Sequence, residues 1–568
     1  MKLLWIPAAV LGALALAQGP ATRNAPPVPR SAPSGKPFPV RFTDVARAMG
    51  LHMKFTYGDE RKKQYILEAN GSGVAFLDYD NDGFQDVFLV NGSSFQDLPR
   101  GQAPTNHLYR NAGGGKFIDT SRAAGVARSG WGSGVCVADF DNDGFDDFYV
   151  TYWGPNVLYR NSGKGAFEDV TARAGVAGAG DWNTGCSFLD YDRDGHLDLV
   201  VASYQRFDPA KTPPPGSGPT CEWKGMPVFC GPRGLPFGSV TLYHNRGDGT
   251  FEDVSAASGM RNGQGFYAFT TVTADLNGDG WPDIYIACDS TPSLLYRNNQ
   301  DGTFTEVATE AGVAFNENGA EQGGMGVAAG DFDNDGQIDL LKTNFAGDYP
   351  NVYRNLGRGI FEDVVLRAGL AVNSQYVGWG IGLADFDNDG LKDIFQVNGH
   401  VYPELQGRAG DEQYLNPRLV YRNLGNGRFE DVSAMAGPGV AQRLSSRGAA
   451  FGDFDNDGAM DVLIMNMGEP PSLLRNTLTS RNHWIKVKLQ GTRSNRGAVG
   501  AAVTIGRQME ALLSQSSFLS HNDSRLHFGL GSAVSVDGIT VRWPSGAVEK
   551  FPGSPADRTV TLVEGTAP

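Results

Sequence analysis

The chain has 568 residues, of which 63 are acidic and 48 basic, giving a formal net charge of −15. This acidic balance excludes nucleic-acid binding, which needs a basic face. With 76 glycines and 40% hydrophobic residues, the composition indicates an ordered, turn-rich fold of many short strands and excludes a disordered chain.

The first 17 residues have the layout of a secretory signal peptide. Lys2 precedes an apolar run over 3–16 that ends at the cleavage-like Ala15-Leu16-Ala17. A membrane anchor is the alternative, but the run is shorter than the ~20 apolar residues of a bilayer span. We predict a signal peptide at 1–17, a Pro/Ala-rich linker at 18–38 and no transmembrane segment in the mature chain. The expected location is outside the cytoplasm: periplasm, cell surface or medium.

A nine-residue pattern, DxDxDGxxD, dominates the next part of the chain. It occurs seven times at spacings of 51 to 85 residues, with apolar runs on both sides. A second motif follows in step, an LYRN-like strand, a Gly-rich turn and an FEDV-like strand, as in 158–161 and 167–170. Four strands per repeat are typical of a propeller blade. We predict an all-β fold with a seven-bladed β-propeller over 39–478.

The two ends of the repeat array complement each other. The seventh repeat stops after its LYRN-like strand at 474–476, whereas 42–45 reads FTDV and precedes the first aspartate loop. We therefore expect the N-terminal strand to complete the last blade and to close the ring, which leaves no open sheet edge between first and last blades.

The repeated loop suits calcium. Ca²⁺ takes about six to eight oxygen ligands, and a glycine at position 6 permits the tight turn that lets alternate residues supply them. Positions 1, 3, 5 and 9 carry carboxylates in every loop except at Asn277, whose amide oxygen can still coordinate. Position 7 varies in side chain, as expected for a backbone-carbonyl ligand. Strand-like residues follow position 9, which excludes an EF-hand. The alternative is a plain Asx-Gly turn, but such a turn needs no fourth carboxylate.

Positions 1, 3, 5 and 9 of the seven loops hold 27 of the 63 acidic residues, and seven Ca²⁺ ions would change the formal net charge from −15 to −1. We therefore expect about seven calcium ions. The predicted ligands are Asp78, Asp80, Asp82, Phe84 and Asp86; Asp139, Asp141, Asp143, Phe145 and Asp147; Asp190, Asp192, Asp194, His196 and Asp198; Asp275, Asn277, Asp279, Trp281 and Asp283; Asp331, Asp333, Asp335, Gln337 and Asp339; Asp385, Asp387, Asp389, Leu391 and Asp393; and Asp453, Asp455, Asp457, Ala459 and Asp461.

The chain has five cysteines. Cys221 and Cys230 bracket a Gly/Pro-rich step that has no core of its own, and we predict that a disulfide staples it; a metal site is the alternative. Cys136, Cys186 and Cys288 lie inside apolar strand-like runs, and we expect each to be a small buried residue.

Two long insertions, 205–238 and 398–417, are the places where recognition is expected, since loops on a rigid scaffold carry function. A further candidate is a set of aromatic residues before several first strands, which could form a ligand face or could pack between blades. They are Trp131, Trp182, Tyr267 and Trp379. No HExxH or GxSxG motif occurs, so catalytic residues are not predicted.

The C-terminal residues, 479–568, contain alternating segments such as WIKVKL and ITVRW between Gly-rich turns, and predict a small β-sandwich-like domain. Arg493, Arg496 and Arg542 are interpreted as surface charges, or as contacts that dock this tail on the acidic propeller.

The repeats resemble the FG-GAP/VCBS repeats also found in integrin α-chain heads, over residues 40–478. The tail motifs at 482–487, 495–501, 526–531 and 541–546 resemble the ASPIC/UnbV domain. This order of domains is similar to that of the cartilage acidic protein family, and the resemblance implies calcium ligands but no catalytic residue. We expect a binding or adhesion scaffold for extracellular protein or glycan. The alternatives are a lyase or glycosidase with its site in the insertions, and a structural component of an envelope or matrix.

Overall fold

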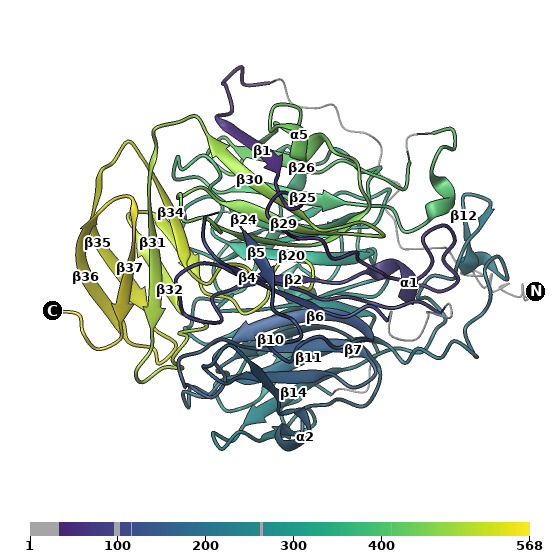
Figure 1. Cartoon of the computed structure of the whole chain (residues 1–568), viewed down its shortest axis with the longest axis horizontal. Coiled ribbons are helices and arrows are strands. Elements are labelled where there is room, and N and C mark those ends of the chain that lie inside the picture. The colour runs from purple at the N-terminus through teal and green to yellow at the C-terminus, as the bar shows by residue number, and fades with distance from the viewer. Residues whose placement is uncertain (1–32, 96–102, 115, 262–264, 411) are drawn as a thin grey trace, which may run out of the picture.

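The computed structural model describes residues 33–95, 103–114, 116–261, 265–410 and 412–568, drawn in colour in Figure 1. The predicted signal peptide and most of the predicted linker lie outside the described residues. Strands predominate in the described part of the chain, and the prediction of an all-β, propeller-like fold is confirmed. No helix in that part is long and apolar enough to cross a membrane.

The strands of residues 40–478 form seven antiparallel units of four strands. The first three units are β2 (Val74–Leu77), β3 (Asp86–Leu89), β4 (His107–Asn111) and β5 (Phe117–Asp119); β6 (Trp131–Ala138), β7 (Asp147–Trp153), β8 (Val157–Asn161) and β9 (Phe167–Asp169); and β10 (Trp182–Leu189), β11 (Asp198–Gln205), β14 (Val240–Asn245) and β15 (Phe251–Asp253). A bridge between Trp153 and Trp182 joins the second and third units into one sheet.

The remaining units follow the same order. They are β16 (Ala268–Ala274), β17 (Asp283–Cys288), β18 (Leu294–Asn298) and β19 (Phe304–Glu306); β20 (Gly324–Gly330), β21 (Asp339–Asn344), β22 (Asn351–Asn355) and β23 (Phe361–Asp363); β24 (Gly378–Ala384), β25 (Asp393–Asn398), β26 (Leu419–Asn423) and β27 (Phe429–Asp431); and β28 (Ser446–Gly452), β29 (Asp461–Asn466) and β30 (Ser472–Leu478) with β1 (Val40–Asp44).

The units are arranged in a ring. The first strand of each unit contacts the first strand of the next, and β28 of the last unit returns to β2. β1 pairs antiparallel with β30, from Val40 opposite Leu478 to Asp44 opposite Leu474, so the N-terminal strand is the fourth strand of the last unit. Figure 1 shows β1 beside β30 at the top of the molecule. β1 therefore pairs with the edge of β30 that would otherwise be open.

Short helices lie in the connections between units. They are α1 (Leu67–Asn70), α2 (Thr171–Ala174), α3 (Ala308–Ala311), α4 (Val365–Ala368) and α5 (Pro438–Ala441). The helices α2, α3 and α4 follow the FEDV-like strands, and their buried alanines Ala174, Ala311 and Ala368 explain the repeated AG in the sequence.

The tail folds into two facing sheets. One contains β34 (Leu526–Gly531), β31 (His483–Gln490) and β37 (Arg558–Val563); the other contains β33 (Gln508–Ala511), β32 (Ala502–Ile505), β35 (Ser535–Arg542) and β36 (Val548–Pro555). Val487, Val503, Phe528 and Trp543 belong to the apolar core between them. In Figure 1 this domain is at the left, at one end of the ring.

One loop of the tail, residues 512–525, enters the centre of the ring, and we call it the channel segment. Phe518 and Leu519 at its tip are buried. Hydrogen bonds join the segment to the first strand of every unit; the partners on β2, β6, β10, β16, β20, β24 and β28 are Phe76, Val135, Phe188, Thr271, Val327, Ile381 and Phe451. The tail therefore fills the ring as well as covering it.

Both disulfides lie in the ring. Cys221 and Cys230 form the predicted one, beside the short hairpin β12 (Glu222–Trp223) and β13 (Met226–Pro227). Cys136 and Cys186 also form a disulfide, between β6 and β10, so the expectation that they are separate buried thiols is wrong. Adjacent first strands bring the two residues together across 50 positions of sequence. Cys288 is free and buried, as expected.

Candidate metal-binding loops

Each aspartate loop joins the first strand of a unit to the second, as the loop between β2 and β3 illustrates. Gly83 at position 6 has a φ of 87°, which a glycine adopts without strain, and donates its N–H to Asp78 Oδ2 at 3.1 Å. Asp86 at position 9 accepts the N–H of Tyr79 at 3.2 Å and of Asn111 at 2.7 Å. Backbone N–H groups of the loop and of β4 thus fix the carboxylates of Asp78 and Asp86.

The predicted ligands converge. In at least four of the loops, three carboxylate oxygens lie within 4.8 Å of one another: Asp78, Asp80 and Asp82; Asp139, Asp141 and Asp147; Asp190, Asp192 and Asp194; and Asp331, Asp333 and Asp339. The varied residue at position 7 turns its side chain outward in the second loop, where the ring of Phe145 lies over Gly163 of the following hairpin turn.

Several buried carboxylate oxygens in these loops have no hydrogen-bond partner. They are Oδ1 of Asp78 and Asp190 at position 1, Oδ1 of Asp141, Asp333, Asp387 and Asp455 at position 3, and Oδ2 of Asp393 at position 9. A buried carboxylate oxygen without a donor costs free energy that a bound cation would recover. Oxygens at alternate positions of a tight loop are also the donors that Ca²⁺ prefers. The residues present therefore fit a calcium ion.

The pKa values of the position 9 carboxyls agree with this fit. Burial, with repulsion from neighbouring aspartates, raises the pKa of Asp86, Asp283 and Asp339 to about 8 each. The same causes raise the pKa of Asp190 to about 8. In the absence of a bound metal ion, protonation of these buried carboxyls lowers the repulsion between them.

The arginine of the LYRN motif balances part of this charge. Arg110 pairs with Asp80 at 2.5 Å and with Asp82 at 2.9 Å, which occupy positions 3 and 5. The same pairing occurs for Arg160, Arg354 and Arg475 in the second, fifth and seventh loops. In the third loop His244 takes this place, and its Nδ1 contacts Asp192 and Asp198.

The asparagine of the same motif links neighbouring units. Asn161 Nδ2 donates to the carbonyl of Tyr79, at position 2 of the preceding loop, at 2.8 Å. All seven repeats make this bond, and Asn111 of the first unit closes the cycle on Phe454 of the last at 2.8 Å; the others are Asn245, Asn298, Asn355, Asn423 and Asn476. Each loop is therefore held by two units.

A second set of bonds joins the loops directly. Asn81 at position 4 donates to the carbonyl of Gly144 in the next loop at 2.9 Å, and Asn456 of the last loop donates to Gly83 of the first at 3.0 Å. Asn142, Arg193, Asn334 and Asn388 make the equivalent contacts. The fourth loop has Gly278 at this position, so the link to the fifth loop is missing. Of the seven links, six are made.

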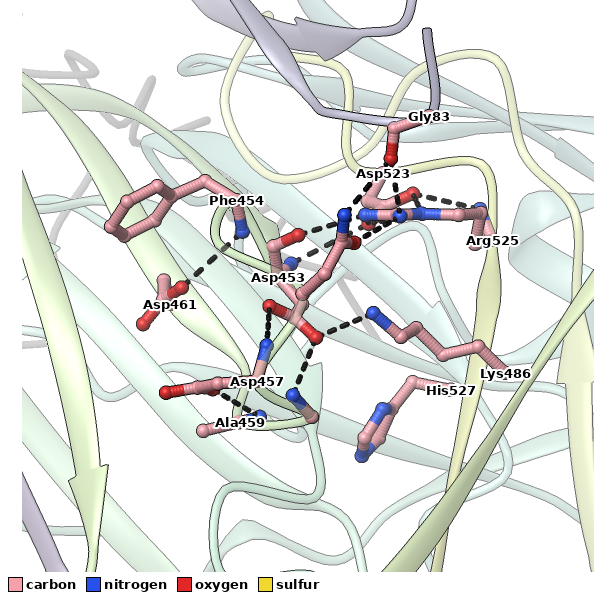
Figure 2. Close-up of polar contacts among 12 residues, drawn as sticks. Gly83, Asp453, Phe454, Asp457, Ala459, Asp461, Lys486, Asp523, Arg525 and His527 are labelled. Carbon is pink, nitrogen blue, oxygen red and sulfur yellow. Dashed lines mark hydrogen bonds and ion pairs between the residues drawn. The ribbon is translucent and has the colours of Figure 1, made fainter. Parts of the chain in front are cut away.

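The tail covers the end of the ring that carries the aspartate loops. Figure 2 shows Lys486 of β31 and Arg525 converging on the seventh loop. Lys486 Nζ pairs with Asp453 Oδ2, and both side chains are buried, with 1% and 0% of their surface exposed. Arg525 donates to the carbonyl of Asp453 at 2.8 Å, to Asn456 Oδ1 at 2.6 Å and to the carbonyl of Gly83 at 3.4 Å. Arg525 therefore bridges the last loop and the first.

Other tail residues contact the second, fourth and sixth loops. Arg542 pairs with Asp275 in the fourth loop, as the docking interpretation of this arginine predicts, and the Arg496 N–H donates to Asn142 Oδ1 at 2.7 Å. His527 Nε2 lies 2.7 Å from Asn388 Oδ1 in the sixth loop. Arg493 contacts Glu549 and Glu564 of the tail itself. The tail is thus a lid over the loop end of the ring.

The four predicted ligand-face aromatics do not form an exposed platform. Trp131, Trp182, Tyr267 and Trp379 are all buried. Trp379 packs edge-on against Phe518 of the channel segment with ring centroids 4.8 Å apart. The ligand-face prediction is wrong for this structure, because the tail and the packing of neighbouring units occupy the faces of these rings.

The two insertions lie at the other end of the ring. They follow second strands, whereas aspartate loops follow first strands, and Figure 1 shows β12 on the side away from the tail. Trp223 packs against His400 and Tyr402 with ring centroids 5.9 Å and 6.0 Å apart, which joins the two insertions. A cavity of about 580 Å³ lies beside them, lined in part by Trp223, Lys224, Leu405 and Arg408.

Sequence reasoning missed the second disulfide, the contacts of Lys486 and Arg525 with the loops, and the roles of the LYRN motif. A signal for the last was present, because the asparagine of the motif recurs in all seven repeats while the preceding arginine does not. An asparagine that recurs in a strand, where it has low propensity, points to a side-chain hydrogen bond.

The fold and the loops define a class, a propeller-like repeat protein with acidic loops that fit cations. The family described as FG-GAP-like repeat matches residues 78–150, 139–201, 228–286, 275–341 and 410–464, more than half of the chain. The description ASPIC and UnbV matches residues 491–568. The chain therefore belongs to the FG-GAP-like repeat family and carries a C-terminal ASPIC and UnbV domain.

Cartilage acidic protein 1 is a relative by sequence. The human protein is 29% identical over 277 residues, which are 46% of this chain and 39% of that protein, and the Xenopus tropicalis protein is 27% identical over 281 residues, 47% of this chain and 40% of that protein. The match thus spans about two fifths of the length of these relatives, and the resemblance to this family is confirmed.

Solved structures with related folds are more distant. A lectin of Agrocybe aegerita that recognises non-reducing terminal N-acetylglucosamine is 18% identical, with a TM-score of 0.38, over 71% of this chain and 94% of that one. A Bacillus licheniformis rhamnogalacturonan lyase is 14% identical, with a TM-score of 0.37, over 77% of this chain and 75% of that one. Neither likeness bears on function at these scores.

Proposed function

We propose that this chain is an exported calcium-binding propeller, over residues 39–478, that binds an extracellular protein or glycan, with the tail at 479–568 as a lid. The observation that carries the calcium proposal is the set of buried carboxylate oxygens without partners in the aspartate loops. Calcium would supply the positive charge that these oxygens lack and would stabilise the fold, because it binds the folded loops and not the unfolded chain.

The recognition surface is proposed at the end of the ring that carries the insertions. The tail covers the end of the ring that carries the aspartate loops, and the channel segment fills the centre of the ring. The chain itself therefore occupies both of these surfaces. The cavity beside the insertions is lined by Lys224, whose Nζ pairs with Glu412 Oε1 at 2.7 Å, by Arg408, and by Trp223, of which 9% is exposed. Aromatic surface with a few charged groups is typical of ligand sites, and loops on a rigid scaffold commonly carry recognition.

A binding experiment tests this proposal. The mature protein is exposed to a pooled panel of extracellular polysaccharides and proteins, with calcium or with chelator, and retained and released material is identified by mass spectrometry. We expect retention that requires calcium, without new fragments. Release of new fragments would instead show an enzyme of the lyase or glycosidase type, and absence of retention from the whole panel would favour a structural role in an envelope or matrix.

Two double variants test where on the protein the ligand binds. Lys224→Ala with Arg408→Ala removes two exposed cations beside the cavity, and Lys550→Ala with Arg558→Ala removes two exposed cations from the tail. We expect the first pair to weaken retention of the captured ligand by at least about tenfold, as for the loss of about 1.4 kcal/mol. We expect the second pair to leave retention of the ligand unchanged. Equal effects would place recognition elsewhere.

A further inference from the structure

The third aspartate loop differs from its siblings in the side chain that faces it. Arginines face the first, second, fifth and seventh loops, whereas His244 of β14 faces the third. A guanidinium has only donors and cannot bind a cation, but a neutral imidazole nitrogen can. The substitution therefore adds a potential metal ligand where the other repeats have a fixed positive charge.

His244 also reaches deeper than the arginines do. Arg110, for example, contacts positions 3 and 5, on the outer side of its loop. His244 Nδ1 lies 3.4 Å from Asp192 Oδ2 at position 3 and 3.1 Å from Asp198 Oδ1 at position 9. These three atoms all lie within 4.8 Å of one another, a spacing that one metal ion can satisfy.

An independent observation is that one buried carboxylate oxygen of this loop has no hydrogen-bond partner. Asp190 at position 1 is 95% buried, since only 5% of its surface is exposed, and its Oδ1 has no hydrogen-bond partner. Asp190 Oδ2 already accepts the N–H of Gly195 at 3.2 Å. Asp190 also converges with Asp192 and Asp194 within 4.8 Å. Asp192 thus belongs to both groups, the one with Asp198 and His244 and the one with Asp190 and Asp194.

We propose that the third loop is a mixed nitrogen–oxygen site that takes a borderline transition ion of the Zn²⁺ class, while the other loops take calcium. This rests on the proposed function, in that the loops bind divalent ions. Ca²⁺ is a hard cation that takes oxygen ligands. Imidazole suits Zn²⁺, which also accepts aspartate oxygens. Asp190, Asp192, Asp198 and His244 are the ligands that the geometry assigns.

The test uses the full mature chain without a histidine tag, stripped with chelator and reloaded with excess calcium and one equivalent of Zn²⁺. Metal content after gel filtration is measured by mass spectrometry. We expect one zinc ion to remain on the wild-type protein. In His244→Arg, the residue found in sibling repeats, zinc affinity falls at least about 100-fold, the upper end of what a lost outer-shell partner costs. The calcium bound to the other loops is unchanged.

Two further variants test whether His244 is a metal ligand or has only a structural role. His244→Gln keeps a side chain of similar size and supplies an amide oxygen, so the third loop is expected to lose zinc and to gain one calcium. His107→Arg is the control, because His107 Nδ1 faces a single carboxylate, Asp119, at 2.8 Å. It keeps the zinc. A cobalt-loaded sample checks nitrogen ligation by its visible spectrum.

The outcomes are distinct for the two proposals. Zinc retained equally by wild type and His244→Arg, or calcium retained by the wild type without any zinc, overturns the mixed site and leaves the calcium proposal standing. Failure to bind either ion in any loop overturns both. Zinc on the wild type, its loss in both His244 variants and calcium uptake by His244→Gln support the mixed site.

Discussion

Lys486 and Lys488 lie two residues apart on β31, and their surroundings predict different costs of removal. Lys486 is buried against Asp453, whereas Lys488 is 47% exposed and lies 4.0 Å from Asp78. Removing one partner of a buried pair leaves an uncompensated charge and costs about 3–5 kcal/mol. An exposed pair contributes about 0–1 kcal/mol.

Lys486→Met is therefore expected to lower the free energy of unfolding by about 3–5 kcal/mol, and Lys488→Met by about 1 kcal/mol or less. Urea denaturation in excess calcium measures both variants against the wild type. If the two variants lose the same stability, the contact of Lys486 with the seventh loop is not a buried ion pair in solution.

The link between aspartate loops is an element repeated around the ring, and it is interrupted at Gly278. This glycine has a φ of 78°, a left-handed value that asparagine also tolerates and that the position 4 asparagines adopt, such as Asn81 at 57°. A Cβ at Gly278 would meet open space, with Gln337 Oε1 the nearest atom at 3.8 Å. An asparagine there could donate to the carbonyl of Gly336, the equivalent acceptor in the fifth loop.

Gly278→Asn is expected to raise the free energy of unfolding by about 0.5–1.5 kcal/mol, the usual net worth of one hydrogen bond. Thermal or chemical unfolding in excess calcium measures it. Gly280→Asn is the control in the same loop and is expected to destabilise, because Gly280 has a φ of 91° and a Cβ there would displace Arg193, whose Nη2 donates to the Gly280 carbonyl. Destabilisation by both changes would show that the loop cannot accept the link.

Whole-molecule stability is expected to depend on pH in opposite ways with and without metal. The pKa of Asp86, Asp283 and Asp339 is about 8 in the folded metal-free protein, whereas an unfolded aspartate titrates near about 3.9. Between these values the folded state binds more protons than the unfolded state. The unfolding free energy of metal-free protein therefore falls as pH rises from about 4 to about 8.

Calcium competes with these protons, so its stabilisation grows over the same pH range. We expect chelation to lower the melting temperature much more at pH 8 than at pH 5. Thermal unfolding with calcium or chelator at both values measures this. A chelator effect of the same size at both values would contradict proton–metal competition in the loops.

Features encoded locally could be predicted from the sequence, and features that join distant residues could not. The aspartate loops and the FTDV strand at 42–45 are visible because each repeat carries its own copy of the pattern. Lys486 and Arg525 are single charges in a tail without repeats, and nothing in the sequence marks their partners, Asp453 and Asn456. The burial of Trp379 likewise depends on Phe518.

The two ends of the chain complete one ring, and this constrains when the protein can fold. The Leu473 N–H bonds Asp44 Oδ1 across 429 residues, and the channel segment near the C-terminus touches every unit. Such long-range contacts form late and make folding slow. Until β30 has been made, β1 has no partner strand, and until residues 512–525 have been made, the ring has no central filling. The complete ring therefore forms only once the channel segment has been made, and a chain that crossed a membrane unfolded before that point would lose no completed ring.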